Sequence, residues 1–464
     1  MRAVTSENQR ADFPPATRGF DEPSFTAEHK SVLLAVILFA GFFPIDLRAQ
    51  EQPLAFTGVQ IIPISGDPID QGVFVVHRGK IITVGPRGTA TPAGATVRDV
   101  SGKVLMPGLV DTHSHIGGIS GGDPSSPIQP ELRVLDSIDV RDASIQKAQA
   151  GGITTANIMH GSGLLMSGQT LYLKLRDGNV IEDLIITNKD GRIAGGMKMA
   201  NGTNPRRDPP FPGTRAKSAA LVREKFVAAQ EYHDKAARAN GDPEKLPARD
   251  LGLEAVVEVL DGKRVVQHHT HRHDDILTVL RLQKEFGFRV VLHHVSEGWK
   301  VADEIAAAKV PCSIIVLDSP GGKLEARDVD WKTGAVLEKA GVLVGFHTDD
   351  SVTDSRLFLR SAAFAVRAGM TRAGALKGLT LAGAIMLDLQ DRIGSLEPGK
   401  DADFILLSGD PLSVYSHVLE TWIDGKKVFD RSDEKDRLWA TGGHGAGNPR
   451  QTPLCCFGTW EDMR

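Results

Sequence analysis

The 464-residue sequence predicts an α/β protein, namely a (β/α)8 TIM-like barrel with a small β-sandwich built from N- and C-terminal segments. In the middle of the chain, apolar β-branched runs alternate with helical segments, and about eight such units over roughly 290 residues suit a closed parallel barrel. On both sides of this region, short alternating strands follow one another with tight turns and no helices. An open doubly wound sheet is the alternative, but the Gly-rich nucleotide-binding fingerprint is missing.

The first 50 residues are expected to lie outside the fold. Residues 31–43 form an uncharged apolar run that fits the core of a secretory signal peptide and is short for a membrane span, which needs about 18 residues or more. We therefore expect an exported protein, periplasmic or secreted, with no stable membrane span after cleavage. The first 30 residues carry five acids, unlike a basic leader, so an over-extended start, an N-terminal anchor and a buried helix remain alternatives.

The domain boundaries follow from the change of pattern along the chain. Residues 51–104 are the expected N-terminal half of the β-sandwich, and residues 105–398 are the expected barrel. Residues 399–432 supply the C-terminal half, where Gly-Asp and Asp-Gly turns separate strands, and residues 433–464 form a loose tail. Within the barrel, residues 205–250 predict a Pro-rich loop and a polar amphipathic helix, an insertion of the kind that shapes access to a site.

Composition narrows the classes of function. The 41% hydrophobic and 24% charged content indicates a globular protein with an ample core. A net charge of -4 gives no electrostatic case for binding nucleic acid or an anionic membrane, so the expected partner is a small-molecule substrate. Three cysteines cannot make a disulfide framework, and none is near the histidines in sequence. Any metal site is therefore built from nitrogen and oxygen. A homo-oligomer is compatible with the sequence, which leaves the oligomeric state open.

A pair of histidines closes the first strand of the barrel region. His113 and His115 are two residues apart, so a strand directs both imidazoles to the same side, where they suit one divalent cation. Alone, the pair also fits two ordinary polar residues in a turn. However, nine of the 15 histidines lie in four short segments that each end an apolar run: His113/His115, His268/His269/His271/His273, His293/His294 and His347. The four segments together predict a metal site at the C-terminal edge of the barrel.

The alternation of side chains along a strand indicates which of the later histidines face the inside of the barrel. If His269 faces inward, His271 does too, whereas His268 faces the helices. Only one of the inward pair needs to bind metal, and the deeper His269 is favoured. In the next strand the inward residue is expected to be His294, with His293 on the opposite face.

Two carboxylates, Asp349 and Asp350, follow a later strand. Asp349 comes first and is better placed at the rim of the barrel. Histidine and aspartate ligands suit zinc, and they also suit iron, manganese or cobalt.

These motifs resemble the amidohydrolase superfamily over nearly the whole mature chain. The resemblance is carried by PGLVDTHSH, the GGITT of strand two, the later His, His and Asp, and the closing IGSLEPGKDADFILLSGDP followed by WIDGKKVF. The sequence is most similar to the imidazolonepropionase-like branch, which includes imidazolonepropionase, related cyclic amidohydrolases and dipeptidases. This resemblance implies a (β/α)8 barrel, a flanking β-sandwich and one or two divalent metal ions, with Zn²⁺ as the expected metal.

The resemblance also implies the site residues. The metal ligands carried over by motif are His113, His115, His269, His294 and Asp349. Lys198 matches the carboxylated lysine of binuclear members, and the alternative is a structural or substrate-binding lysine beside a single metal. Asp349 is the expected catalytic residue, which takes a proton from the nucleophilic water and hands it to the leaving nitrogen. The residues expected to orient the substrate are His160, His271, Arg272, Asp350 and Arg356.

The predicted function is hydrolysis of a C–N bond, other than an ordinary peptide bond, in a small cyclic amide. An Xaa-Pro-type dipeptidase is the close alternative. A deaminase is disfavoured, because deaminating members present a catalytic Glu in an HxxE arrangement and Asp274 and Asp275 follow His271, although Glu297 after His294 keeps it open. A non-catalytic metal-binding barrel would predict lost ligands, and none is visibly lost. Five tryptophans, three tyrosines and no evident acid pair disfavour a carbohydrate-active barrel.

Overall fold

The computed structural model describes residues 52–119, 121–315 and 323–443. The apolar run at residues 31–43 and the tail beyond residue 443 lie outside the described residues, so the leader, the export and a loose tail beyond residue 443 stay predictions. The loose tail predicted for residues 433–464 is wrong at its start, because residues 434–441 form a helix that the Asp433 side chain caps. Within the described residues, no helix combines the length and the apolar character that crossing a lipid bilayer requires.

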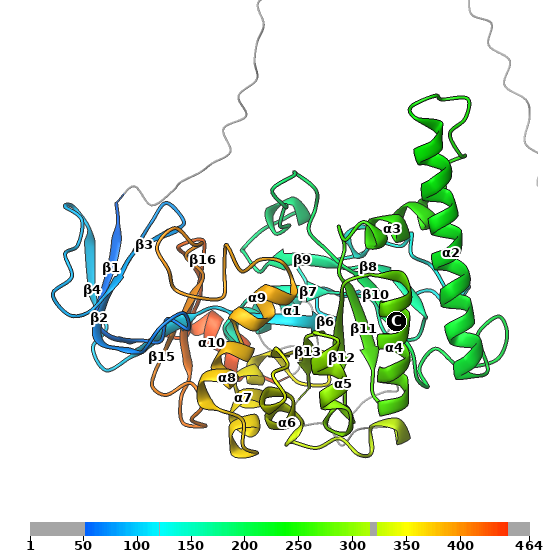
Figure 1. Cartoon of the computed structure of the whole chain (residues 1–464). Coiled ribbons are helices and arrows are strands. Elements are labelled where there is room, and N and C mark those ends of the chain that lie inside the picture. Colours follow the sequence, from blue (N-terminus) through cyan, green and yellow to red (C-terminus); the bar gives the residue numbers. More distant parts are fainter. Residues whose placement is uncertain (1–51, 120, 316–322, 444–464) are drawn as a thin grey trace, which may run out of the picture. The chain divides into compact units, whose positions relative to one another are not determined.

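Strands from the two ends of the chain form one eight-stranded sheet. Its order is β17-β16-β15-β5-β1-β2-β3, with β4 paired to β1, and Figure 1 shows the blue N-terminal strands beside the orange C-terminal ones. The strands are β1 (Leu54–Ile61), β2 (Ile69–His77), β3 (Lys80–Gly85), β4 (Thr96–Asp99), β5 (Val104–Pro107), β15 (Phe404–Leu407), β16 (Val418–Ile423) and β17 (Lys426–Asp430). The expected β-rich unit built from both termini is therefore present as a single sheet, and its division into two layers stays a prediction.

An aromatic cluster fills the core of this sheet. Phe56 packs edge-on against Phe404 and Trp422, with ring centroids 5.2 and 5.5 Å apart. Phe74 packs against Phe404 at 4.9 Å. Edge-to-face aromatic pairs at this spacing stabilise a core beyond the area that they bury. The cluster therefore ties N-terminal strands to C-terminal strands.

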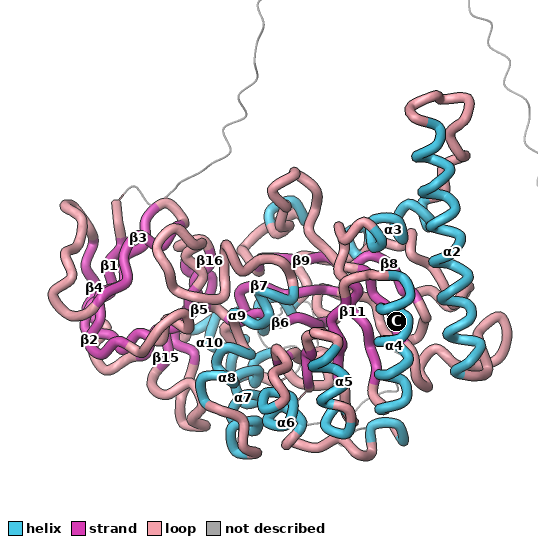
Figure 2. The backbone as a smooth tube through the Cα atoms, viewed as in Figure 1, coloured by secondary structure: helices cyan, strands magenta, loops and turns pink. Residues whose placement is uncertain are grey.

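The middle of the chain forms two further sheets. The six-stranded sheet has the order β14-β13-β12-β11-β10-β8, in which β10 to β14 run parallel, and Figure 2 shows helices flanking these strands. Its strands are β8 (Met166–Gln169), β10 (Met197–Ala200), β11 (Val266–Thr270), β12 (Val290–His294), β13 (Cys312–Ile314) and β14 (Val344–Phe346). The other sheet consists of β6 (Leu109–Ser114), β7 (Ile153–Ile158) and β9 (Leu171–Lys174). Nearly every residue of these strands is buried, as in parallel sheets covered on both faces.

Backbone hydrogen bonds join the two sheets at both of their edges. The N–H of Asp349, beyond β14, donates to the carbonyl of His113 in β6 at 2.9 Å. On the other side, the N–H of Thr170 donates to the carbonyl of Gly196 at 2.9 Å. The paired ladders nevertheless form two sheets rather than one continuous cylinder, so closure of the barrel stays a prediction.

Helices alternate with the parallel strands. They are α1 (Ala143–Ala150), α2 (Arg215–Ala239), α3 (Leu251–Leu260), α4 (His273–Phe286), α5 (Ala302–Ala307), α6 (Thr333–Lys339), α7 (Phe358–Arg367), α8 (Arg372–Gly378), α9 (Leu381–Met386) and α10 (Glu434–Thr441). The spacing of alanines and charges in residues 131–152 predicts a helix over this whole segment, but the observed helix is shorter. It begins only at α1, because the Asp142 side chain caps it by accepting the Ser144 N–H. Gly152, at a φ of +88°, then turns the chain into β7.

The insertion at residues 205–250 contains the predicted helix as α2. Thr214 caps its start by accepting the Lys217 N–H, and Asn240 ends it in a left-handed conformation. Phe226 holds α2 against the rest of the fold, because its buried ring stacks on Phe286 and Phe288 with centroids 4.9 and 5.1 Å away. The helix is thus packed against α4 and the start of β12 rather than being wholly solvated.

A buried ion cluster connects β9 to the C-terminal strands. The Lys174 ammonium lies 2.7 Å from Asp401 and 3.2 Å from Asp403, and it also donates to Asp424. The Lys174 side chain is 1% exposed. The three acids belong to the closing sequence motif, whose charges therefore serve the junction between the β-rich sheet and the central strands.

Candidate metal centre

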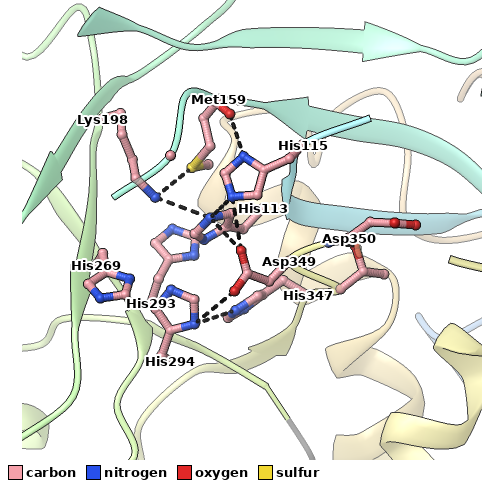
Figure 3. Close-up of polar contacts among 12 residues, drawn as sticks. His113, His115, Met159, Lys198, His269, His293, His294, His347, Asp349 and Asp350 are labelled. Atoms are coloured by element: carbon pink, nitrogen blue, oxygen red, sulfur yellow. Dashed lines mark hydrogen bonds and ion pairs between the residues drawn. The ribbon is translucent and has the colours of Figure 1, made fainter. Parts of the chain in front are cut away.

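Histidines from four strand ends converge on one point. Figure 3 shows His113 of β6 at the middle of this group. Its ring centroid lies 5.0 Å from that of His115, 4.9 Å from those of His293 and His294, and 5.0 Å from that of His347. The convergence that the sequence predicted for the C-terminal ends of the strands is therefore present.

Three overlapping groups of side chains are able to hold a metal ion. In each group the ligand atoms lie within 4.8 Å of one another. The groups are His113, His293 and His347; His269, His271 and His294; and His113, His294 and Asp349. Because His113 and His294 each belong to two groups, the geometry suits either one ion or two neighbouring ions.

The state of the imidazoles fits a metal. Burial lowers their pKa values well below the ordinary value, so at neutral pH each ring is uncharged and keeps a lone pair. Five buried ring nitrogens of the converging histidines have no hydrogen-bond partner among the described residues: His113 Nδ1, His269 Nδ1, His271 Nε2, His293 Nδ1 and His294 Nε2. Buried polar atoms almost always have partners, so this concentration indicates a site that a cation completes.

Asp349 places a carboxylate between the imidazoles. Its Oδ1 lies 2.9 Å from His115 Nε2 and 3.4 Å from His113 Nε2, and its Oδ2 lies 4.0 Å from His294 Nδ1. Burial alone would raise the pKa of Asp349, but the hydrogen bond and charge of His115 hold it below the ordinary value. The carboxylate is therefore ionised and can act as a ligand or as a proton acceptor.

Asp111 fixes the loop that carries Asp349. The buried Asp111 carboxylate accepts hydrogen bonds from the N–H of Thr348 at 3.0 Å and from its hydroxyl at 2.5 Å. It also accepts the N–H of His113 at 3.2 Å. One side chain thus connects the strand that bears His113 to the residue preceding Asp349.

Lys198 of β10 reaches the same centre. Its ammonium nitrogen donates to His113 Nε2 at 3.1 Å and lies 3.2 Å from the sulfur of Met159. The side chain is fully buried, and burial lowers the pKa of Lys198 to about 7. The structure therefore brings the lysine selected from the sequence into direct contact with a predicted ligand, as a readily deprotonated amine.

The orientation predicted for His293 is wrong. In the parallel ladder between β11 and β12, His293 pairs with His269, so both side chains point to the inner face. His293 Nε2 lies 2.8 Å from Gln267 Oε1, and the ring packs on His113. His294 also points inward, because its backbone has a φ of +69°, which breaks the two-residue alternation at the strand end. His268 faces the helices as predicted and lines a small cavity with residues of α2 and α4.

His347 is a further member of the centre that the sequence analysis did not select as a ligand. Its Nε2 lies 3.1 Å from His294 Nδ1 and its Nδ1 lies 2.8 Å from the Ser313 hydroxyl. Burial lowers the pKa of His347 to about 3, so the ring is uncharged. Its position directly after an apolar strand was the available signal.

A cavity of about 430 Å³ opens on the centre. Five of the predicted site residues line it, namely His115, His269, His271, His294 and Asp349. The other lining residues are Ser162, Asn204, Ser296, Ile315, Lys323, Ala326, Val329 and Val352. A concave site of this size, in which polar groups converge beside a smaller apolar wall, suits a small molecule. Asn204 and Lys323 were not anticipated from the sequence.

Four residues predicted to orient the substrate are not among those that line this cavity. Arg272 is held at the start of α4 by both carboxylate oxygens of Asp274, each 2.9 Å away. Arg356 forms an ion pair with Asp354. The carboxylate of Asp350 turns away from the centre (Figure 3) and accepts hydrogen bonds from Ser355.

His160, the fourth of these residues, is buried after β7. For Arg272, Asp350 and Arg356, local acids or hydroxyls satisfy the charges that the sequence analysis assigned to a substrate. These contacts hold the three side chains away from the cavity lining, and their role in orienting a substrate stays a prediction.

Glu297, which kept a deaminase open, does not reach the cavity. Its Oε2 accepts hydrogen bonds from the backbone N–H of His273 at 3.0 Å and from the His273 ring at 2.6 Å. Its Oε1 lies 3.0 Å from the ammonium of Lys300. The carboxylate is therefore engaged outside the metal centre and is absent from the cavity lining.

Comparisons with known proteins identify the family of the chain. The model of the amidohydrolase family matches residues 104–428. The crystal structure of an amidohydrolase from Thermotoga maritima MSB8 is similar with a TM-score of 0.76 and 35% identity, over 82% of this chain and 100% of that one. Amidohydrolase tasK of Hapsidospora irregularis is 28% identical over 77% of this chain, which spans only 40% of that protein's length. The imidazolonepropionase of Pseudomonas entomophila is 27% identical, over 73% of this chain and 87% of that protein. The chain therefore belongs to the amidohydrolase family and has imidazolonepropionases among its relatives.

Proposed function

We propose that the protein is a metal-dependent hydrolase that cleaves a C–N bond, other than an ordinary peptide bond, in a small cyclic amide. The observation that carries this proposal is the group of buried, uncharged imidazoles with unpartnered nitrogens around the ionised Asp349, at the mouth of a 430 Å³ cavity. The imidazolonepropionase relatives support the reaction class. The backbone hydrogen bonds at both edges of the central sheets support the finer architecture, a closed (β/α)8 barrel beside a two-layered β-sandwich.

The proposed metal ligands are those selected from the sequence: His113, His115, His269, His294 and Asp349. Lys198, as a carbamate, would supply a further anionic ligand for the metal, and its contact with His113 together with its lowered pKa supports this, since the uncharged amine is the form that reacts with carbon dioxide. Zinc is the proposed metal, because it prefers a mixed set of imidazole and carboxylate ligands. A divalent cation here supplies Lewis acidity, which lowers the pKa of bound water toward about 7 and polarises the scissile carbonyl.

The protein's own groups then move the proton. Asp349, ionised and held by His115 at 2.9 Å, takes a proton from the attacking water and passes it to the leaving nitrogen. Asp111, through Thr348, keeps the Asp349 carboxylate aimed at the same point during both transfers. His271 lines the cavity beside this group and is placed to contact the substrate.

An Xaa-Pro-type dipeptidase is the second candidate function. It is favoured by one observation, the cationic Lys323 in the cavity wall close to the metal centre. A dipeptide carries a free carboxylate near its scissile bond, and a cation at this position would bind it.

Metal content per chain tests the proposal, measured on protein purified without added metal and paired with the intact mass of the chain. Two ions and a carbamate on Lys198 support the binuclear hydrolase, whereas one ion and an unmodified lysine support a mononuclear one. His294→Ala and Asp349→Ala are expected to lose metal and turnover. His273→Ala is the matched control, since this histidine is half-exposed and bonded to Glu297 away from the cavity. No metal under any supplementation, or intact turnover in both centre variants, would refute the assignment.

A further inference from the structure

We propose that the cavity selects substrates with a carboxylate beside the scissile C–N bond, and that Lys323 and Asn204 bind this carboxylate. The inference rests on the proposed hydrolase function and specifies in addition that the substrate carries a negative charge. Lys323 and Asn204 come from different loops, after β13 and β10 respectively, and meet at the cavity wall. The ammonium donates to Asn204 Oδ1 at 3.0 Å and to His269 Nε2 at 3.3 Å.

Lys323 is the only cationic side chain among the described residues of the cavity lining. The one anionic residue of the lining is Asp349, which belongs to the metal centre. The remaining wall is made of the apolar side chains Ile315, Ala326, Val329 and Val352 and the small polar residues Ser162 and Ser296. The cavity thus offers an incoming molecule an apolar wall and one positive charge, placed next to the centre rather than at the entrance.

Glu325 holds the ammonium from behind without entering the cavity. Its Oε1 lies 3.3 Å from the Lys323 ammonium, and its Oε2 accepts the N–H of Thr203 at 2.7 Å. Glu325 is buried, and it can approach this closely because residue 202 is a glycine without a Cβ. A Cβ at that position would lie only 2.6 Å from Glu325 Oε2. Arg215 lies 3.8 Å from the same oxygen. The negative charge of Glu325 is therefore shared with groups behind the wall, whereas the Lys323 side chain stays 29% exposed.

Glu325 offsets part of the charge of the Lys323 ammonium, but the remaining positive charge is unfavourable beside a bound divalent cation unless a further anion joins them. An ammonium that contacts His269, a proposed metal ligand, repels a divalent cation bound there, because like charges a few ångströms apart repel strongly at low dielectric. A substrate carboxylate between them interacts favourably with both charges. This physical reason favours an anion-binding role over a purely structural lysine.

The distances also limit where the carboxylate lies in the substrate. Because the ammonium contacts the imidazole of a proposed ligand directly, the carboxylate must lie within a few bonds of the carbonyl that is attacked. Two classes of small molecule meet this condition in a cavity of about 430 Å³: a lactam with a ring carboxylate, and a dipeptide with its free C-terminus.

Matched carboxylate and carboxamide probes test the inference. The pairs are 5-oxoproline with 5-oxoprolinamide, for the lactam class, and glycylproline with glycylprolinamide, for the dipeptide class. Calorimetry on the metal-loaded protein measures binding, and product analysis measures hydrolysis. We expect at least one carboxylate to bind about 10-fold to 100-fold more tightly than its carboxamide, the range of a charge-assisted hydrogen bond. Lys323→Met is expected to abolish this preference, and Asn204→Ala to reduce it.

Lys332→Met is the matched control. Lys332 lies on the same segment and pairs with Asp330 at 2.9 Å, but it does not line the cavity, so its variant is expected to keep the preference. Metal affinity gives a second readout. Lys323→Met is expected to bind zinc more tightly than the wild type, because a repulsive charge is gone, whereas a loss of zinc affinity would make Lys323 a structural support and overturn the inference.

The outcomes separate the inference from the function on which it rests. If a carboxylate binds in a Lys323-dependent way and no probe is hydrolysed, the inference stands and the hydrolase proposal is contradicted for these classes. If hydrolysis occurs without a preference for the carboxylate, the hydrolase stands and the inference is overturned. Failure of both carboxylates to bind the wild type also overturns it.

Discussion

Replacement of Lys174 by methionine should be among the most destabilising single changes in the molecule. The side chain is 1% exposed and its ammonium is the shared partner of three carboxylates, those of Asp401, Asp403 and Asp424. At an effective dielectric constant of about 20, unit charges 2.7 and 3.2 Å apart attract by about 6 and about 5 kcal/mol. Desolvation of the ions offsets most of this attraction in the wild type, but the variant keeps the buried acids without their cation. Breaking a buried pair in this way costs about 3–5 kcal/mol.

Lys80→Met is the matched control for burial. Lys80 pairs with Asp401 at 2.5 Å, so it has an acid in common with Lys174, but its side chain is 50% exposed. Because half of the Lys80 side chain is exposed and Asp401 keeps Lys174 and Arg392 as partners, the variant should lose about 1 kcal/mol or less. Urea unfolding followed by circular dichroism and tryptophan fluorescence measures both variants.

Two results would refute the reasoning about Lys174. One is a Lys174→Met protein whose free energy of unfolding lies within about 1 kcal/mol of the wild-type value. The other is an equal loss of stability in Lys80→Met. A double variant sharpens the test. Asp403→Asn in the Lys174→Met background should recover part of the loss, because the described residues provide Asp403 with no second cation.

Three further predictions concern pH, packing and the centre. Burial raises the pKa of Asp403 to about 6 even beside Lys174. An acid with a raised folded-state pKa contributes stability below its unfolded pKa of about 4 and loses it as the pH rises through the folded-state value. Removal of the Lys174 charge raises the folded-state pKa of Asp403 further, so the deficit of Lys174→Met should be larger at pH 8 than at pH 5 in urea unfolding, and an equal deficit would contradict this. Phe226→Ala should cost about 3–5 kcal/mol in the same assay, against about 0.5 kcal/mol or less for the exposed neighbour Val227→Ala. Asp111→Ala should lower metal content, because it releases the loop after β14, and full metal occupancy would count against that role.

Much of the fold was predictable from the sequence because its signals are local. Alternating strands with tight turns at both ends, and strand-helix units between them, appear as predicted. The helix expected at residues 131–152 was too long, since the periodicity continued through a segment in which Asp142 caps a later start. Periodicity reports which residues suit a helix, whereas a cap decides where the helix begins.

The candidate site was predicted less completely. The pairing of His113 with His115, and the approach of Lys198 and Asp349, agree with the structure. His293 was assigned to the wrong face, because a strict two-residue alternation allows only one of two neighbours to point inward. The left-handed backbone at His294 brings both to the centre. The residue type predicts that conformation only weakly, because non-glycine residues adopt a positive φ at few positions even though histidine is enriched among them.

Local sequence signals predicted which segments become strands and helices, that histidines close several strands, and that any metal site there would have nitrogen and oxygen ligands. These properties follow from side-chain period, turn residues and composition, each of which acts over a few neighbouring residues. Only the tertiary structure shows which imidazoles meet at the candidate metal centre and which charged groups reach the cavity. Lys323 and His269 are 54 residues apart in sequence and 3.3 Å apart in space, whereas Arg272, next to the histidine cluster in sequence, is bound to Asp274 instead. Such contacts depend on how strands and loops far apart in the chain are brought together, which no local pattern records.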